Sequence, residues 1–356
     1  MFELFLPKGI LATVINCPPL VRICEHLSGL AALALRLGGM SRKALWLFLA
    51  AGLAWGIPYF FIRIAVEDFS TYSIVLFRVL IGAIVLVPLA LKQGALKLAL
   101  KHWPWVLVFA LLEMAGPWWL ITESGRHLSS GLIGLLIATV PFFAVLFATF
   151  MGDKSVRHPK TIMGLLLGFA GVVALVGVDS FGGLIDPLWV GAVILAAVGY
   201  ALAPALISSK IGFVPTAGVI SLSMVIVGVI YAVPAALTLP AEIAAGPAIE
   251  SWIALLVLGV ICSAVAFIIF FALIKEVGAA RATLLTYLNT LVALVLGVLF
   301  LNEPITTGLL IGFPLILVGS WFAGKRHEVK PKKNKGSNLS SAVSTDTTEL
   351  DVLPKG

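Results

Sequence analysis

The sequence predicts an all-α polytopic membrane protein with ten transmembrane helices in two inverted five-helix repeats. Of its 356 residues, 60% are apolar and only 12% are charged, whereas soluble domains have about 45–50% apolar and about 25% charged residues. Ten apolar runs have roughly the 20 residues that an α-helix needs to cross a bilayer. The two halves of the chain also share motifs in the same order. These observations exclude a soluble globular enzyme.

The apolar runs alternate with short polar loops. They cover residues 44–65, 72–91, 104–122, 129–151, 160–178, 187–208, 216–237, 251–274, 281–301 and 305–323. If the N-terminus is inside, 21 of the 24 Lys and Arg residues fall on the inner side. Cytoplasmic loops collect Lys and Arg, so we expect both termini to be cytoplasmic, in the cell (inner or plasma) membrane. The net charge of +7 therefore signals orientation, and no nucleic-acid partner is expected.

Two flanking segments lie outside the predicted helices. Residues 1–43 contain three prolines and several charges, so they make a poor span. Met40 precedes a basic pair and the first strong span, so two alternatives remain: a translated extension, or an over-long gene model with its native start at Met40. Residues 325–356 are polar and rich in Lys, Ser and Thr, which predicts a disordered basic cytoplasmic tail.

An internal repeat divides the chain into residues 44–179 and 187–324. Pro141-Phe142-Phe143-Ala144 in the first half corresponds to Thr290-Leu291-Val292-Ala293 in the second, and Ala54-Trp55-Gly56 corresponds to Gly199-Tyr200-Ala201. Each half contains five spans, and five is odd, so the second half must cross the membrane in the opposite sense. Inverted repeats of this kind are typical of secondary transporters, whose substrate site lies near the midplane between the halves.

The motifs Leu53-Ala54-Trp55-Gly56, Leu76-Phe77-Arg78 and Gly168-Phe169-Ala170-Gly171 resemble those of the drug/metabolite transporter (DMT) superfamily. The resemblance is to EamA-type transporters with two EamA repeats, and it covers about residues 41–325. It implies transport of amino acids, metabolites or drugs, with efflux as the expected direction. Asp153 replaces the usual Glu, Asn302 a Gly and Thr290 a Pro. The last change removes an expected kink, so the halves should bend unequally.

Arg78 and Glu113 are the two ionisable residues expected deep in the membrane. They lie roughly 9 Å and roughly 14 Å from the outer side, at 1.5 Å of rise per residue. A charge at such depth is costly and usually functional. Four alternatives remain: a structural Arg78–Glu113 ion pair, a Glu113 carboxyl that takes up protons for coupling, an Arg78 guanidinium that binds a substrate anion, and side chains that reach the membrane surface because they snorkel or because the span boundaries differ.

Aromatic and polar residues within the spans form a second group of candidates. Trp55 and Tyr200 occupy equivalent repeat positions, so they either face one central cavity or pack against neighbouring helices. Asn289 and Thr290 either contact a ligand or join helices. The candidate substrate-binding or coupling residues are Arg78, Glu113, Trp55, Tyr200, Tyr287, Asn289 and Thr290. Trp118 and Trp119, near the outer end of their span, are expected to be interfacial anchors, with a role in the site as the alternative.

Helix breakers and small residues indicate where spans bend and touch. Proline removes a backbone hydrogen bond and kinks a helix; the candidate hinge or gating residues are Pro58, Pro117, Pro141 and Pro204. Glycines four residues apart allow close approach of membrane helices. Such pairs occur at Gly52/Gly56, Gly164/Gly168 and Gly308/Gly312, where we expect packing and no binding site.

The sequence favours a secondary transporter that moves a small organic solute by alternating access. No catalytic constellation, metal site or cofactor is expected, because the five histidines are scattered and form no ligand motif. The expected partners are the solute, the lipid bilayer, protons as coupling ion and a second copy of the chain in a homodimer. The alternatives are a flippase for lipid-linked substrates and, less favoured, a membrane-embedded enzyme.

Overall fold

The computed structural model describes residues 41–150, 159–181, 186–277, 282 and 285–324, and in this part of the chain all regular structure is helical. This agrees with the predicted all-α class. The predicted N-terminal extension, the acidic turn at Asp153 and the basic tail lie outside the described residues. The first half forms α3 Arg42–Gly56, α4 Pro58–Ala65, α5 Thr71–Lys92, α6 Ala95–Lys101, α7 Trp103–Phe109, η2 Ala110–Ala115, α8 Gly116–Ser124, α9 Ser130–Ile137, α10 Val140–Phe150 and α11 Pro159–Phe181.

The second half continues with fewer but longer helices. They are α12 Pro187–Ile211, α13 Thr216–Ala244, α14 Ile249–Gly259, η4 Val260–Val265, α15 Ala266–Val277, α17 Leu285–Phe300 and α18 Thr307–Gly324. Seven helical segments in the described residues are long and apolar enough to cross a membrane, and three shorter apolar helices occupy the remaining predicted spans. The surface carries large exposed hydrophobic side chains, such as Ile84 at 73% and Val229 at 70%, as lipid-facing helices require.

Several helices begin at hydroxyl or carboxyl caps in the polar loops. The side chains of Ser41, Ser70, Ser129 and Asp186 each accept a backbone N–H from the first turn of the next helix. These caps satisfy N–H groups that no helical carbonyl can reach. These four cap residues therefore determine where the helices of spans one, two, four and six begin.

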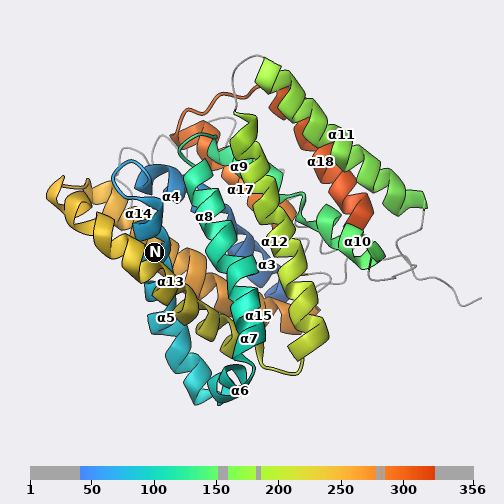
Figure 1. Cartoon of the computed structure of the whole chain (residues 1–356). Coiled ribbons are helices and arrows are strands. Elements are labelled where there is room, and N and C mark those ends of the chain that lie inside the picture. The colour runs from blue at the N-terminus through green and yellow to red at the C-terminus, as the bar shows by residue number, and fades with distance from the viewer. Residues whose placement is uncertain (1–40, 151–158, 182–185, 278–281, 283–284, 325–356) are drawn as a thin grey trace, which may run out of the picture.

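The strongest helix contacts connect the two halves. α5 packs on α13, and α11 packs on α18, a pair that lies at one edge of the bundle (Figure 1). α3 contacts α15 and α17 in the same way that α12 contacts α8 and α10. These are corresponding spans of the two repeats, so the packing follows the internal symmetry expected from the sequence.

Glycines allow the closest of these contacts. A Cβ at Gly52 would collide with Leu288 of α17, and one at Gly319 of α18 would meet the backbone of Gly168. Gly312 likewise faces Leu175 and the Gly171 carbonyl of α11. One glycine of each predicted pair, Gly52, Gly168 and Gly312, therefore lies at a close helix contact in this structure.

The halves bend unequally, as the replacement of proline by Thr290 predicts. Span four is broken between α9 and α10, just before Pro141, whereas α17 runs unbroken through Thr290. Span one is also broken, at Ile57, directly before Pro58. Proline at the first turn of a helix needs no N–H partner, and both prolines lie in the first turn of the helix after the break.

Candidate functional site

Arg78 is buried between the two halves of the bundle. Its side chain extends from α5 and is 8% exposed. Its Nε donates a hydrogen bond to Ser263 Oγ of η4 at 3.1 Å, and its guanidinium carbon lies 3.8 Å from the ring centroid of Trp118 in α8. The stacked ring favours the cation. Arg78 is thus held by one residue of each repeat.

The Arg78–Glu113 ion pair considered from the sequence does not form. Among the described residues, the ion pairs are Lys43–Glu276 and Glu123–Arg126, both partly exposed. Arg78 instead has neutral partners, because α5 presents it to α8 and η4 while Glu113 projects from η2. The Arg78 guanidinium and the Glu113 carboxyl therefore do not pair with each other.

A group of neutral polar residues surrounds the Arg78 charge. Tyr59, Tyr200 and Cys262 lie close to the guanidinium. Tyr59 and Cys262 are buried, at 8% and 0% exposure, whereas Tyr200 is half-buried. Tyr200 also lies near Glu113. We call Arg78, Trp118, Ser263, Tyr59 and Tyr200 the Arg78 cluster.

Glu113 lies at the centre of a π-helix, η2. Its Oε2 is enclosed and has no hydrogen-bond partner among the residues that the structure describes. Pro117 comes four residues later; it has no N–H to offer the Glu113 carbonyl, and its ring crowds that carbonyl. The wide turn of η2 accommodates this proline, and the Tyr231 hydroxyl donates to the Ala115 carbonyl at 2.8 Å. Single π-turns of this kind are frequent at functional sites.

A second π-helix, η4, occupies the corresponding place in the second half. η2 covers Ala110–Ala115 and η4 covers Val260–Val265, an offset of 150 residues. Glu113 in one therefore corresponds to Ser263 in the other. The Ser263 hydroxyl donates to the Leu258 carbonyl at 2.9 Å, which leaves its oxygen lone pairs for Arg78. The two wide turns were not predicted; Pro117 was the available signal for η2.

The interfacial role expected for Trp118 is wrong. Trp118 is 4% exposed and lies over Arg78, while its neighbour Trp119 is half-buried. The 100° step between helical neighbours turns the two rings to different sides of α8. Depth along the span could not distinguish an anchor from a site residue, because that depends on the rotation of the helix.

Trp55 and Tyr287 make no polar, ring or charge contact with the Arg78 cluster in the described part of the chain. Trp55 packs against Phe267 and Phe270 of α15, with centroids 5.4 and 4.6 Å apart. Tyr287 is half-buried on α17. Of the aromatic pair at equivalent repeat positions, the structure brings Tyr200 to the charges and packs Trp55 among phenylalanines.

Asn289 and Thr290 join helices. The Thr290 hydroxyl is fully buried and lies 3.0 Å from the Gly134 carbonyl of α9. The Asn289 amide, oriented to satisfy its neighbours, donates to the Gly52 carbonyl of α3 at 3.0 Å. Both contacts are interhelical hydrogen bonds of the kind that membrane proteins use for packing. Of the two alternatives for these residues, the structure favours helix packing.

The four candidate hinge prolines differ in setting. Pro58, Pro117 and Pro141 each lie in the first turn after a break or a π-helix. Pro204 lies inside α12, which continues through it without interruption. Three of the four therefore mark irregular backbone, where bending requires the fewest hydrogen bonds to change.

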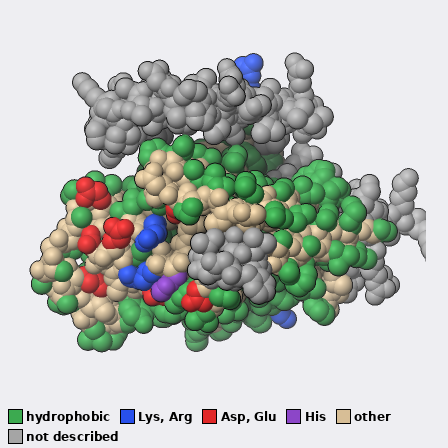
Figure 2. Space-filling model, turned by 90° about the horizontal axis from the view of Figure 1, so that it is seen from above, with side chains coloured by type: hydrophobic (Ala, Val, Ile, Leu, Met, Phe, Trp, Pro, Cys, Tyr) green, Lys and Arg blue, Asp and Glu red, His purple; other side chains and the backbone are tan. Residues whose placement is uncertain are grey.

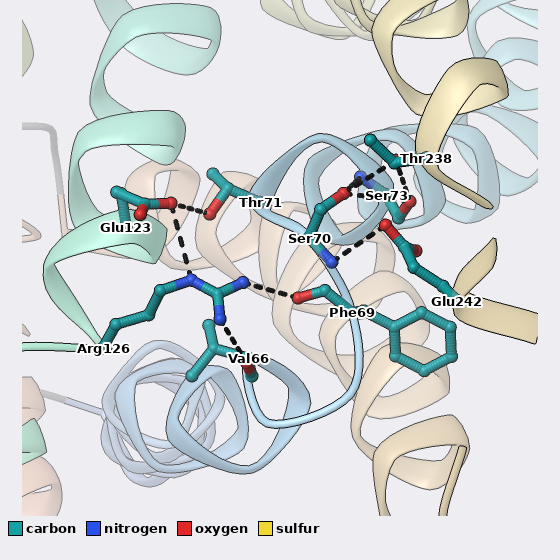
Figure 3. A network of polar contacts seen from close by, with 9 residues as sticks. All are labelled: Val66, Phe69, Ser70, Thr71, Ser73, Glu123, Arg126, Thr238 and Glu242. Atoms are coloured by element: carbon teal, nitrogen blue, oxygen red, sulfur yellow. Dashed lines mark hydrogen bonds and ion pairs between the residues drawn. The ribbon is translucent and has the colours of Figure 1, made fainter. Parts of the chain in front are cut away.

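A second polar network lies at the end of the bundle formed by the loops predicted to be outside (Figure 3). Glu242 Oε1 accepts the Ser70 N–H at 3.1 Å, and Ser70 Oγ is 3.0 Å from Thr238 Oγ1. Arg126 donates to the Val66 and Phe69 carbonyls at 2.5 and 2.7 Å. Glu123 contacts both Arg126 and Thr71.

The same end carries further contacts between the halves. Asp68 Oδ2 accepts the Ala248 N–H at 3.0 Å and the Ser251 hydroxyl at 2.6 Å. Acidic, basic and histidine side chains gather on part of this face among hydrophobic ones (Figure 2). We call the set that connects the halves here the outer latch; its members are Asp68, Ser70, Thr238, Glu242 and Ser251.

Glu303 makes a related contact across the halves. Its carboxylate accepts the N–H groups of Ser130 and Gly131 at 2.7 and 3.2 Å, and the Ser130 hydroxyl at 2.9 Å. Carboxylates are stabilised by the free N–H groups and dipole at a helix start. The sequence placed these acids on one side of the membrane, but their partners come from distant segments and were not predicted.

Comparison with known proteins identifies the family of this bundle of two repeats. The sequence profile of the EamA-like transporter family matches residues 42–177 and again 187–324. The chain belongs to the EamA-like transporter family. Both matches coincide with the two halves whose contacts build the Arg78 cluster, and the family explains why each half contains the same order of spans.

Relatives in the EamA-like family are also named as transporters. The chain is 29% identical over 293 residues to the uncharacterized transporter YvbV of Bacillus subtilis (strain 168), covering 82% of this chain and 94% of that protein. It is 27% identical over 250 residues to the uncharacterized inner membrane transporter YedA of Escherichia coli (strain K12), covering 69% and 78%. A crystal structure of a protein 22% identical to this chain matches with a TM-score of 0.56, covering 80% of this chain and 97% of that one. That match shows the fold alone.

Proposed function

We propose that this EamA-like transporter exports a small organic solute, such as an amino acid, a metabolite or a drug, by alternating access. The observation that carries the proposal is the Arg78 cluster, in which a buried arginine of one inverted repeat is held by Ser263 of the other. A site made by both halves changes its access when one half rocks against the other.

The proposal assigns the cell membrane as location, with both termini in the cytoplasm. The charge distribution of the loops supports this orientation, and the outer latch then closes the side that faces away from the cytoplasm. Glu113 is the candidate for proton coupling, since its carboxyl lies in mid-span with one unpartnered oxygen. Without such coupling, the gradient of the solute itself would drive transport.

Reconstitution of the full chain into liposomes tests the proposal. We expect flux of at least one member of a panel of labelled amino acids and cationic dyes, measured with and without a pH gradient against protein-free liposomes. The absence of flux for every member would count against solute transport. A fluorescent-lipid scrambling assay on the same liposomes would then test the flippase alternative, and conversion of an added lipid substrate would test the enzyme alternative.

A further inference from the structure

Arg78 is a buried cation with no counter-ion in the described part of the chain. Its direct partners there are the neutral Ser263 hydroxyl and the Trp118 ring. Its other electrostatic neighbours are Tyr59, Tyr200 and Cys262, which are neutral in their protonated forms. A charge in the membrane interior is costly unless it is paired. The residues around Arg78 orient its charge but do not neutralise it.

The free donors of Arg78 are its two terminal nitrogens. A guanidinium has five N–H groups in a planar fork, and Ser263 engages the one on Nε. The terminal nitrogens make no hydrogen bond within the described residues. The enclosed, unpartnered polar atoms of this part of the chain belong to Glu113, Ser223 and Glu242. Arg78 is not among them, and it keeps 8% of its surface exposed, so its terminal nitrogens are the donors left for a ligand.

We propose that the transported solute carries a carboxylate, which binds these two nitrogens of Arg78 in a bidentate pair. The proposal rests on the transport function proposed above and names the substrate class of the same site. Planar carboxylates match the guanidinium fork in shape as well as charge. A single cation balances a single negative charge, so a monocarboxylate suits this low-dielectric position better than a doubly charged phosphate ester.

The neighbours of Arg78 suit the rest of such a solute. Trp118 covers one face of the guanidinium, and Tyr200 lies near both Arg78 and Glu113. Aromatic walls with a few directed polar groups are typical of small-molecule sites. Ser263 acts as a positioning residue, because it fixes the Nε edge and leaves the opposite edge of the fork for the carboxylate.

Matched acid and amide probes separate charge recognition from shape. The purified full chain is titrated with phenylacetate, phenylacetamide and phenyl phosphate, and binding is followed by thermal shift. We expect phenylacetate to stabilise the protein and phenylacetamide and phenyl phosphate to bind at least about tenfold more weakly, because a charge-assisted pair is lost or unbalanced. Equal binding of acid and amide, tighter binding of phenyl phosphate, or no binding of phenylacetate would each overturn the proposal.

Two variants test whether phenylacetate binds at Arg78. Arg78→Gln should weaken phenylacetate binding about 100-fold, whereas Arg63→Gln, which removes an arginine outside the cluster, should leave it unchanged. Ser263→Ala keeps the Arg78 charge and should weaken phenylacetate binding several-fold with no effect on phenylacetamide, which keeps the test informative if Arg78→Gln fails to fold. Unchanged phenylacetate binding in a folded Arg78→Gln or Ser263→Ala would contradict the assignment.

Liposome flux distinguishes this proposal from the transport function. If cationic dyes cross through the wild-type protein and through Arg78→Gln at equal rates, the transport function stands and the carboxylate assignment is overturned. If no solute crosses, the failure belongs to the transport function, and the binding titrations still decide whether Arg78 recognises a carboxylate.

Discussion

Individual residues show why depth alone does not define a site in this protein. Arg78 and Glu113 were recognised from the sequence, because an ionisable side chain in an apolar run is conspicuous whatever the helix rotation. Their partners were not, because contact depends on the direction in which each side chain leaves its helix. Ser263, the hydrogen-bond partner of Arg78, lies 185 residues away in the chain. Trp118 was misassigned for the same reason.

Glu113 carries the first prediction. Replacing Glu113 by Gln removes the titratable carboxyl but keeps a polar side chain of similar size. If this carboxyl exchanges protons during transport, Glu113→Gln should abolish uptake driven by a pH gradient while solute-driven exchange persists. Liposome flux at a series of external pH values measures this. Full activity with an unchanged pH dependence would exclude Glu113 as the coupling group.

At the scale of helices, the packing of α12 against η2 gives a prediction about stability. A Cβ at Gly199 would lie 2.5 Å from the Leu112 carbonyl oxygen, a backbone atom that cannot swing away. Gly199→Ala should therefore destabilise the protein by about 1–3 kcal/mol, as measured by thermal unfolding in detergent.

Gly191 on the same helix is the matched control for Gly199. Apart from the backbone of α12 itself, no described atom lies within 4 Å of the position of its Cβ, and alanine is favoured over glycine within a helix by about 0.5–1 kcal/mol. Gly191→Ala should therefore be neutral or stabilising. Equal effects of the two substitutions would mean that α12 does not approach η2 this closely.

The outer latch gives a prediction about access. Glu242→Gln removes the charge from the side chain that accepts the backbone N–H of Ser70, and Ser70→Ala removes the hydroxyl that contacts Thr238. Together they weaken the contact between α13 and the start of α5 and should favour opening on that side. Cys262 is a native reporter, since it is fully buried beside Arg78. With Cys17 and Cys24 changed to Ser, a membrane-impermeant thiol reagent added outside should label Cys262 several-fold faster in the latch variant.

The control for the latch variant is Lys43→Gln, which breaks the Lys43–Glu276 contact at the predicted inner end. That pair is exposed, at 71% and 30% for its side chains, so its loss should change the stability of the protein little. It should not accelerate labelling from outside. Labelling of Cys262 at the same rate in the latch variant and the wild type would show that these contacts do not control access.

For the whole molecule, most of the fold could be predicted because each span is encoded locally. An apolar run of sufficient length specifies a membrane helix, and Pro58 and Pro141 signal where spans one and four break. The closely packed glycines were also recognisable. The two π-helices were not predicted, because an extra residue in one turn rotates the remainder of the helix without changing its apolar composition.

Orientation is a property of the whole chain, and it can be tested directly. The loop charges predict that a fluorescent protein fused to the C-terminus folds and fluoresces in the cytoplasm, and that alkaline phosphatase fused after a truncation at Gly246 is active outside. Gly246 lies in the turn between α13 and α14. The reverse activities would mean that the protein is inserted in the opposite orientation, with the outer latch on the cytoplasmic side.

The two wide turns also bear on the history of the chain. η2 and η4 lie at the same place in spans that now cross the membrane in opposite senses, yet only η2 is succeeded within two residues by a proline. Two separate insertions at one position would be a coincidence, whereas one insertion in a single five-helix ancestor accounts for both. By this account the irregular turn is older than the gene duplication, and Glu113 and Ser263 are divergent descendants of one ancestral residue.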